Sequence, residues 1–345
     1  MNVRSSEAFW LQDTESGIRA RVCSGGASLM ELRVPLADGT YRDVVLGYDD
    51  PETYRANEPH LGHTVAPVAN RIGGGTFTLN GKTYQLNKND GENANHGGSH
   101  AMHGRLWKVD SFSDNSVTFS YECADGENGF PGPLHMDVTY TVRDRALLID
   151  FHALAAQDTL FNPTNHSYFN LKGQGKGDIL DHVLTVYADQ ITPPGPKNVP
   201  EGTFLDVEGT PFDFRTPEVI GARINADEPI LKNARGYDQN FVLKKEEPLH
   251  EKDYDAHGNN VFLAARLAAP DGSVALEVLT DLPGLQIYTA NYLAGEEGKG
   301  GVHYQPQSSV CLETQYCPNA INIPSFPHPV AYKAKDLYTR TVYRF

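Results

Sequence analysis

The segment Thr76-Phe77-Thr78-Leu79-Asn80-Gly81-Lys82-Thr83-Tyr84-Gln85-Leu86 carries the clearest structural signal in the chain. Apolar side chains alternate with polar ones on both sides of Asn80-Gly81, as they do in strands with one buried face. Asn and Gly accept the positive φ angles of a two-residue hairpin turn. The segment therefore predicts two antiparallel strands joined by a tight turn.

The same period of two recurs along the rest of the sequence. It is found at residues 117–121, 136–142, 149–153, 274–278, 285–289 and 338–344. The 32 Gly and 22 Pro suit many short strands joined by turns. Helical signals are few: Asp50-Pro51-Glu52 puts Pro at a first helical position, and residues 217–225 are a second candidate. We therefore expect an all-β fold of packed, mostly antiparallel sheets with a few short helices.

No shift in composition, internal repeat or low-complexity tract divides the 345 residues. The long turn-rich stretches, residues 190–210 and 244–260, are typical of loops inside a domain rather than of linkers. Since all-β folds often run long as single domains, we predict one domain over residues 1–345.

The bulk properties exclude several classes of function. A net charge of −15 repels phosphate backbones and argues against nucleic acid as a partner. No apolar run approaches the roughly 20 residues that cross a bilayer, so we expect no membrane span. The first twelve residues do not resemble a signal peptide. The cysteines, at positions 23, 123, 311 and 317, fit neither a disulfide framework nor paired zinc ligands, which predicts free thiols and a cytoplasmic protein.

A carboxylate lies within the apolar segment Val310-Cys311-Leu312-Glu313-Thr314-Gln315. In a strand, Val310, Leu312 and Thr314 share one face, and Cys311, Glu313 and Gln315 share the other. Burial raises the pKa of a carboxyl group unless partners hold it ionised. Glu313 is therefore a candidate functional residue.

A dense set of hydrogen-bonding groups follows a predicted strand at Asn162-Pro163-Thr164-Asn165-His166-Ser167-Tyr168-Phe169-Asn170-Leu171. Such residues are common in turns for purely local reasons. Sugar sites, however, also combine hydroxyl-binding groups with aromatic rings, so His166 and Tyr168 are candidates for a binding site.

Three histidines, His96, His100 and His103, occur in one segment and raise the question of a metal site. Helical spacing would bring them onto one face, but Gly97, Gly98 and Gly104 disfavour a helix. We therefore predict no metal, and a loop that presents one histidine to a cleft.

Two further side chains are candidates for binding hydroxyl groups. Arg71 offers five donors, although a surface ion pair is the ordinary role of an exposed arginine. Asp238, in Gly236-Tyr237-Asp238, could accept bonds from two neighbouring hydroxyls or form an Asx turn. Gly81-Lys82-Thr83 looks like part of a phosphate-binding loop, but its spacing is wrong and it lies in the predicted hairpin.

Together these segments resemble the aldose 1-epimerase (galactose mutarotase) family, from about Gly25 to the C-terminus. The resemblance rests on several stretches in order: Val68-Ala69-Asn70-Arg71-Ile72, Asn95-His96-Gly97-Gly98, Thr164 to Leu171, Gly236-Tyr237-Asp238, Pro283 to Asn291, and Cys311 to Gln315. It implies a large antiparallel β-sandwich (supersandwich) with an open sugar cleft, a small-molecule sugar substrate, no cofactor, and a monomer or homodimer.

The resemblance also implies residue roles. Glu313 is expected to be the general base and His166 the general acid. The residues expected to contact the sugar are Asn70, Arg71, His96, Tyr168, Asp238 and Gln286. Interconverting α and β anomers requires a base at the C1 hydroxyl and an acid at the ring oxygen. Mutual attraction is expected to hold Glu313 ionised and His166 protonated.

Some positions depart from the family pattern, and they leave the preferred sugar open. Ala101-Met102 replaces a common Gly-Phe pair, Gln239 a frequent His and Gln307 a frequent Arg. Rival functions are a 1-epimerase for a disaccharide such as maltose, a glycosidase, and a non-catalytic sugar-binding protein. A glycosidase normally needs two carboxylates, and only Asp238 accompanies Glu313.

Overall fold

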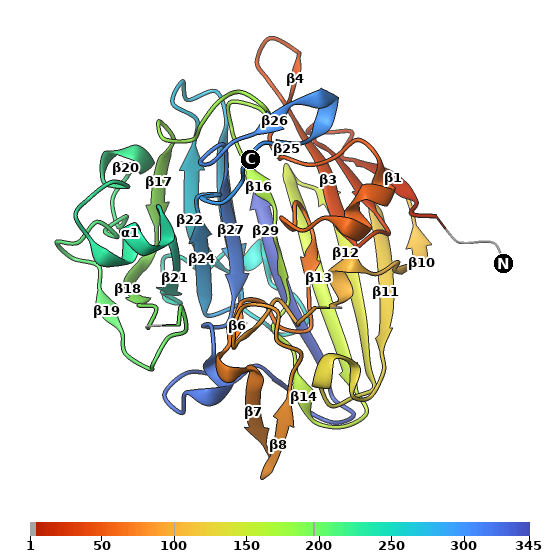
Figure 1. The fold of residues 1–345 in the computed structure, drawn as a ribbon. Helices are drawn as coiled ribbons and strands as arrows, with labels where there is room; N and C mark the ends of the chain where they lie inside the picture. The colour runs from red at the N-terminus through yellow and green to blue at the C-terminus, as the bar shows by residue number, and fades with distance from the viewer. Residues whose placement is uncertain (1–4, 100, 196) are drawn as a thin grey trace.

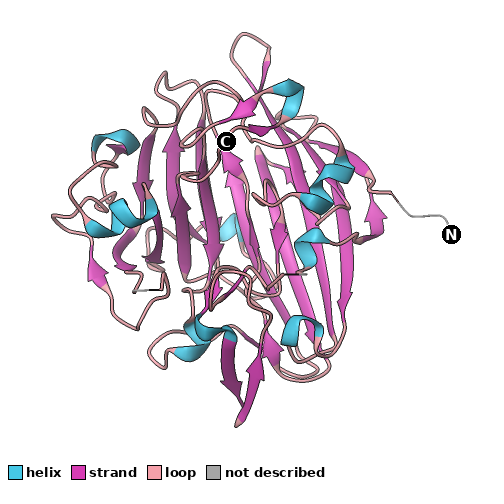
Figure 2. Cartoon of the chain, viewed as in Figure 1, coloured by secondary structure: helices cyan, strands magenta, loops and turns pink. Residues whose placement is uncertain are grey.

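The computed structural model describes residues 5–99, 101–195 and 197–345. Two large sheets dominate it, and short helical turns lie around their edges (Figures 1 and 2). The nine-stranded sheet runs, in spatial order, β10 (Lys108–Phe112), β11 (Ser116–Cys123), β12 (Leu134–Arg143), β13 (Ala146–Ala155), β29 (Asp336–Arg344), β23 (Ala275–Thr280), β22 (Phe262–Ala268), β17 (Val183–Val186) and β20 (Glu218–Val219). The six-stranded sheet runs β16 (Tyr168–Phe169), β27 (Val310–Gln315), β24 (Gly284–Tyr288), β21 (Asp238–Leu243), β18 (Ala188–Thr192) and β19 (Leu205–Asp206).

Smaller sheets complete the strand structure. A four-stranded sheet joins β1 (Ala8–Gln12), β2 (Arg19–Cys23), β3 (Ser28–Pro35) and β4 (Tyr41–Asp43). Five two-stranded pairs are β5 (Thr64–Val65) with β15 (Thr164–Asn165), β6 (Arg71–Ile72) with β9 (Ala94–Asn95), β7 (Thr76–Leu79) with β8 (Lys82–Gln85), β14 (Thr159–Leu160) with β28 (Val330–Ala331), and β25 (Glu296–Glu297) with β26 (His303–Tyr304).

The predicted hairpin is confirmed by β7 and β8. Their antiparallel register pairs Thr76 with Gln85 and Leu79 with Lys82. Asn80 and Gly81 have φ angles of 51° and 77°, as a tight turn of this type requires. Because Lys82 begins a strand here, the Gly-Lys-Thr sequence has no helix N-terminus with which to bind phosphate.

Helices are short throughout the described residues. The one α-helix among them is α1 (Pro229–Ala234), and the 3-10 turns are η1 (Pro51–Ala56), η2 (Gly73–Gly75), η3 (Met102–Gly104), η4 (Glu127–Gly129), η5 (Ile220–Ala222), η6 (Lys252–Tyr254), η7 (Lys299–Gly301) and η8 (Ala320–Asn322). The Asp50 carboxylate caps η1 by accepting from the Glu52 amide, as the sequence indicated. The helix predicted at 217–225 is only partly present: the 3-10 helix η5 covers residues 220–222, whereas Glu218 and Val219 form β20 and pair with β17. In the part of the chain that is described, no helix has the length and apolar character to cross a membrane.

The two large sheets pack face to face. Thr314 of β27 lies with its hydroxyl oxygen 2.5 Å from that of Thr341 on β29. The rings of Phe169 and Tyr343 meet edge to face, with centroids 4.9 Å apart. Alternate residues of β12, from Leu134 to Val142, belong to the main apolar cluster, and β12 packs against β1 and β2 of the four-stranded sheet. This sandwich confirms the predicted fold class.

The largest apolar cluster contains side chains from both large sheets and from the four-stranded sheet, for example Leu285, Phe151 and Leu29. Burying one such side chain stabilises the fold by about 1.5–3 kcal/mol. A shared core of this kind agrees with one domain over residues 1–345, which stays a prediction.

Candidate active site

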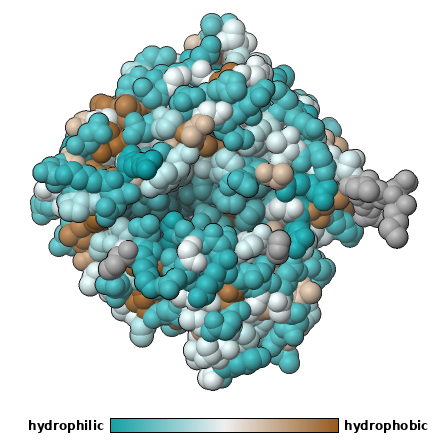
Figure 3. Space-filling model, in the orientation of Figure 1, coloured by the Kyte–Doolittle hydropathy of each residue, from teal (hydrophilic) through white to brown (hydrophobic). Residues whose placement is uncertain are grey.

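A cavity of about 450 Å³ opens beside β6, β24 and β27. In Figure 3 this face of the molecule is hollowed near its centre, and the walls are mostly hydrophilic. The cavity brings together all eight residues that the sequence analysis singled out: Asn70, Arg71, His96, His166, Tyr168, Asp238, Gln286 and Glu313. Segments from both halves of the chain therefore meet at one cleft.

Strand β27 turns Glu313 into this cleft. All six residues of β27 are buried. Val310 and Leu312 enter the core between the sheets, whereas Glu313 lines the cavity on the other face. The predicted alternation along the strand is confirmed. Only 2% of Glu313 is exposed, so its carboxylate lies in a low-dielectric environment.

Gln286 and Asp238 lie beside Glu313 on neighbouring strands. The antiparallel register places Gln286 directly opposite Glu313. Leu285 and Ile287, its neighbours on β24, enter the core, as the sequence pattern predicted. The Gln286 Nε2 donates to Asp238 Oδ1 over 2.7 Å and so holds that carboxylate in place.

His166 lies beside Glu313, just before strand β16, which pairs with β27. Its Nε2 lies 3.6 Å from Glu313 Oε1. The backbone amide of His166 donates to His63 O over 2.8 Å, and its ring stacks on Tyr168 with centroids 4.9 Å apart. The Tyr168 hydroxyl in turn donates to Pro59 O over 2.7 Å. The imidazole is therefore held by packing and by its backbone rather than by a carboxylate partner.

Short backbone pairings hold the part of the cleft that contains Asn70, Arg71 and His96. Strands β6 and β9 pair Arg71 with Asn95, and the next residue, His96, adopts a φ angle of 49°. The backbone N–H of Asn70 donates to His96 Nδ1 over 3.2 Å. Because Nδ1 accepts this bond, the proton of a neutral ring lies on Nε2, where it can serve as a donor. Arg71 Nε pairs with Asp90 over 2.6 Å.

Burial dominates the electrostatics of the cleft. Burial, with a further effect from Asp238, raises the pKa of Glu313 well above its ordinary value. Burial and the neighbouring His60 lower the pKa of His166 to about 3. Burial also raises the pKa of Asp238, although Arg71 and Gln286 oppose this shift.

Burial opposes the charge state expected from the sequence. Attraction between Glu313 and His166 was expected to hold both charged. Removal of water from the two side chains opposes the charge on each of them.

Several cleft atoms are buried without a hydrogen-bond partner among the described residues. They include His166 Nδ1, Glu313 Oε2 and Gln286 Oε1. A buried polar atom without a partner costs about 1–3 kcal/mol. A polyhydroxylated ligand would satisfy atoms of this kind, and an apolar ligand would not.

Sequence reasoning missed some of the residues that line the cleft: Glu58, Pro59, His60, Asn95, Tyr288, Tyr292, Leu293, Ala294 and Glu296. The His60 ring lies 5.2 Å from the His96 ring and 6.0 Å from the His166 ring, measured between centroids. Its segment has no periodicity, so only the assembled fold reveals it. Tyr288 was detectable, because it lies within the Pro283–Asn291 stretch already quoted.

The three-histidine segment divides in the structure. His96 lines the cleft, whereas His103 lies in η3 and lines a neighbouring hollow. His100 lies outside the described residues. Within the described part of the chain, no cluster with metal-ligand spacing includes His96 or His103.

The departures from the family pattern lie around the cleft rather than in it. Ala101 and Met102 are buried, and Met102 O accepts from the Trp107 ring over 3.0 Å. Gln239 is buried and lines an adjoining cavity. Gln307 contacts Arg235 O over 3.5 Å.

Known proteins resemble this chain over nearly its whole length. The family described as "Aldose 1-epimerase" matches residues 10–343. The galactose mutarotase of Sus scrofa is 40% identical over 338 residues, which cover 98% of this chain and 93% of the relative. The aldose 1-epimerase of Escherichia coli K12 is 32% identical over 333 residues, which cover 96% and 92%. The crystal structure of a GalM/aldose epimerase homologue from C. elegans superposes with a TM-score of 0.86 at 28% identity, covering 98% of both chains.

Proposed function

The chain belongs to the aldose 1-epimerase family and is therefore an isomerase of carbohydrates, and we propose that Glu313 and His166 catalyse the interconversion of α and β anomers in the cleft. The substrates proposed are free aldoses such as galactose and glucose. The single observation that carries the assignment of residues is the 3.6 Å approach of His166 Nε2 to Glu313 Oε1 inside a polar cavity.

The reaction needs one proton to leave the C1 hydroxyl and one to reach the ring oxygen. Glu313 takes the first as general base, and His166 supplies the second as general acid. The ring opens, the C1–C2 bond rotates, and the carbonyl is attacked on its other face. The two residues exchange roles as the ring closes, so the enzyme returns to its starting protonation state.

Sugar binding supplies hydrogen bonds that stabilise the charged forms of Glu313 and His166, which burial disfavours. A C1 hydroxyl that donates to Glu313 favours the ionised carboxylate, and a ring oxygen that accepts from His166 favours the protonated imidazole. The uncharged pair and the pair of ionised carboxylate and protonated imidazole each hold one proton in total. The bound sugar therefore moves that proton from the Glu313 carboxyl group to the His166 imidazole without exchange with solvent.

The remaining walls suit a sugar. We propose that Asn70, Arg71, His96, Tyr168, Asp238 and Gln286 bind its hydroxyl groups. Asp238 and Gln286 support this role because their hydrogen bond fixes an acceptor beside the base. His96 supports it through the donor at Nε2 that its bond with Asn70 leaves free.

A disaccharide is a second candidate substrate. A cavity of about 320 Å³ adjoins the cleft and shares Asn70, Arg71, Asp238, Gln286 and Tyr292 with it. A reducing sugar in the main cleft would leave this neighbouring space for a second ring. A ratio of kcat/KM for maltose over glucose above one would favour this substrate.

The cellular setting is part of the proposal. We propose a cytoplasmic enzyme, because all four cysteines are buried as free thiols. The small-molecule sugar is the partner proposed, and a charge of −15 disfavours nucleic acid. We propose no membrane partner and a monomer or homodimer.

Exchange spectroscopy by NMR tests the assignment of residues. At anomeric equilibrium, the wild-type protein is expected to produce exchange cross-peaks between the two H1 signals of glucose. Glu313→Gln and His166→Gln are expected to abolish them, and Glu297→Gln, which changes an exposed carboxylate, is expected to keep them. Exchange at the wild-type rate in either cleft variant would reject that residue's role.

A further inference from the structure

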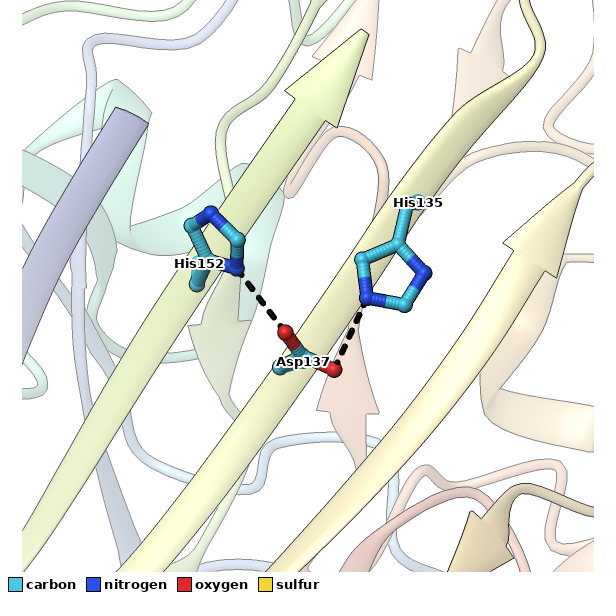
Figure 4. A group of neighbouring side chains, drawn as sticks. All are labelled: His135, Asp137 and His152. Atoms are coloured by element: carbon cyan, nitrogen blue, oxygen red, sulfur yellow. Dashed lines mark hydrogen bonds and ion pairs between the residues drawn. The ribbon is translucent and has the colours of Figure 1, made fainter. Parts of the chain in front are cut away.

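Two histidines and an aspartate converge on the solvent-facing side of the nine-stranded sheet. His135 and Asp137 lie on β12, and His152 lies on β13 (Figure 4). His135 Nε2 is 3.1 Å from Asp137 Oδ1, and His152 Nδ1 is 2.8 Å from Asp137 Oδ2. One ligand atom from each residue lies within 4.8 Å of the other two. None of the three lines the sugar cleft.

The strand register produces this convergence. Asp137 and His152 are direct partners across β12 and β13. His135 lies two residues before Asp137, so the period of two puts both on the same face. Their neighbours Met136 and Val138 enter the core on the other face. The three side chains therefore stand on rigid, paired strands rather than on a loop.

Two more carboxylates orient the rings from outside. His135 Nδ1 lies 2.5 Å from Glu122 Oε1, and His152 Nε2 lies 2.8 Å from Asp336 Oδ1. Tyr338 stacks on the His152 ring at 4.5 Å between centroids. Each ring thus gives its far nitrogen to a carboxylate and turns its near nitrogen toward Asp137, as Figure 4 shows for the near side. Metal-binding histidines typically have this arrangement of an outer carboxylate behind the imidazole.

We propose that His135, Asp137 and His152 bind a divalent zinc-class metal ion through His135 Nε2, His152 Nδ1 and the Asp137 carboxylate. Tetrahedral bonds of about 2.0–2.1 Å separate neighbouring ligand atoms by roughly 3.3 Å. The two separations from the Asp137 carboxylate, 3.1 and 2.8 Å, are already close to that value, so small side-chain rotations admit the ion. Water completes the coordination on the exposed side.

The donor set selects the metal class. Two imidazole nitrogens and one carboxylate suit zinc and its neighbours in the first transition row, whereas calcium and magnesium prefer all-oxygen sites. Glu122 and Asp336 add negative charge without occupying the near nitrogens. The ion would tie β12 to β13 and stabilise the sheet, with no part in the chemistry of the cleft.

Calorimetric titration of EDTA-treated protein with Zn²⁺ at neutral pH tests the proposal. The wild type is expected to bind one ion at this site and to melt at a higher temperature with the ion present. His135→Asn and His152→Asn are each expected to weaken this binding by more than about tenfold. Glu122→Gln and Asp336→Asn are expected to weaken it by about tenfold. His303→Asn, an exposed histidine on β26, serves as the matched control and is expected to bind as the wild type does.

The cleft also contains histidines, so Zn²⁺ bound there must be distinguished from Zn²⁺ bound by His135 and His152. A double variant, His135→Asn with His152→Asn, is expected to lose both the high-affinity ion and the rise in melting temperature while it keeps anomer exchange. The proposal is overturned if the wild type binds no Zn²⁺. It is equally overturned if the folded double variant binds Zn²⁺ with unchanged affinity, or if His60→Asn abolishes the binding instead.

Discussion

The His166 imidazole and the Glu313 carboxylate approach to 3.6 Å in a cleft where burial opposes the charge on each. Water would stabilise the charge on each group, and burial removes that stabilisation. Under the proposed mechanism, the pair holds a single proton, and that proton moves when a sugar supplies new hydrogen bonds.

The dependence of kcat/KM on pH is expected to be bell-shaped. Burial lowers the pKa of His166 to about 3, so a second proton joins the pair only in strong acid, and the acidic limb lies low. Burial raises the pKa of Glu313. The pair therefore keeps its single proton through the pH range in which a glutamate ordinarily ionises, and loses that proton only at higher pH. Steady-state rates across pH measure both limbs. A profile with no alkaline limb over the whole pH range in which the protein stays folded would count against this pair.

Replacing Asp238 with Asn is expected to move the alkaline limb to lower pH. The Asp238 carboxylate is one of the groups that raise the pKa of Glu313, so its removal lets that pKa fall. The same pH series of kcat/KM reports the change. Asp206→Asn, outside the cleft on β19, is the control. An alkaline limb that stays fixed or moves upward in Asp238→Asn would refute the coupling.

Gln286→Leu is expected to raise KM about tenfold, with a smaller effect on kcat, because one hydrogen bond of about 1–1.5 kcal/mol is lost. The amide holds Asp238 Oδ1 at 2.7 Å. Gln190→Leu removes a comparable bond, 2.8 Å long, to Asp206 outside the cleft and is expected to leave KM unchanged. Initial rates over a range of sugar concentrations separate the two constants. Equal KM values in the two variants would show that Gln286 has no binding role.

A stability prediction concerns Lys299, which is 4% exposed. Its ammonium donates to Met30 O and Val45 O, each over 2.8 Å, and to Asp43 over 2.5 Å. Lys299→Met leaves this carboxylate buried and unpaired, which is expected to lower the free energy of unfolding by about 3–5 kcal/mol. Urea denaturation measures the change.

The control for this prediction is Lys232→Met, which removes an exposed ion pair with Asp227. It is expected to cost about 0–1 kcal/mol. Equal unfolding midpoints in the two lysine variants would contradict the account of Lys299.

The period of two explains how much was predictable from sequence. It fixed the cleft-facing orientation of Glu313 and Gln286 because each lies between residues that enter the core. It also located the hairpin at Asn80-Gly81. Local pattern failed at residues 218–219, where pairing with β17 overrode the helical signal.

What the sequence could not give depends on the assembled fold. His60 reaches the cleft through a loop without periodicity, and the rings of His96 and His166 become its neighbours only by folding. The pKa shifts of Glu313 and His166 follow from burial, which pattern alone does not measure. The cluster of His135, Asp137 and His152 likewise depends on strand register.

Polarimetry tests the central claim most directly. Freshly dissolved α-D-glucose, α-D-galactose and maltose are each followed as their optical rotation approaches equilibrium. The wild-type protein is expected to accelerate this approach for at least one sugar, and Glu313→Gln and His166→Ala are each expected to lose that acceleration by about 10²-fold or more. No acceleration with any of the three sugars, or full acceleration by either variant, would contradict the account.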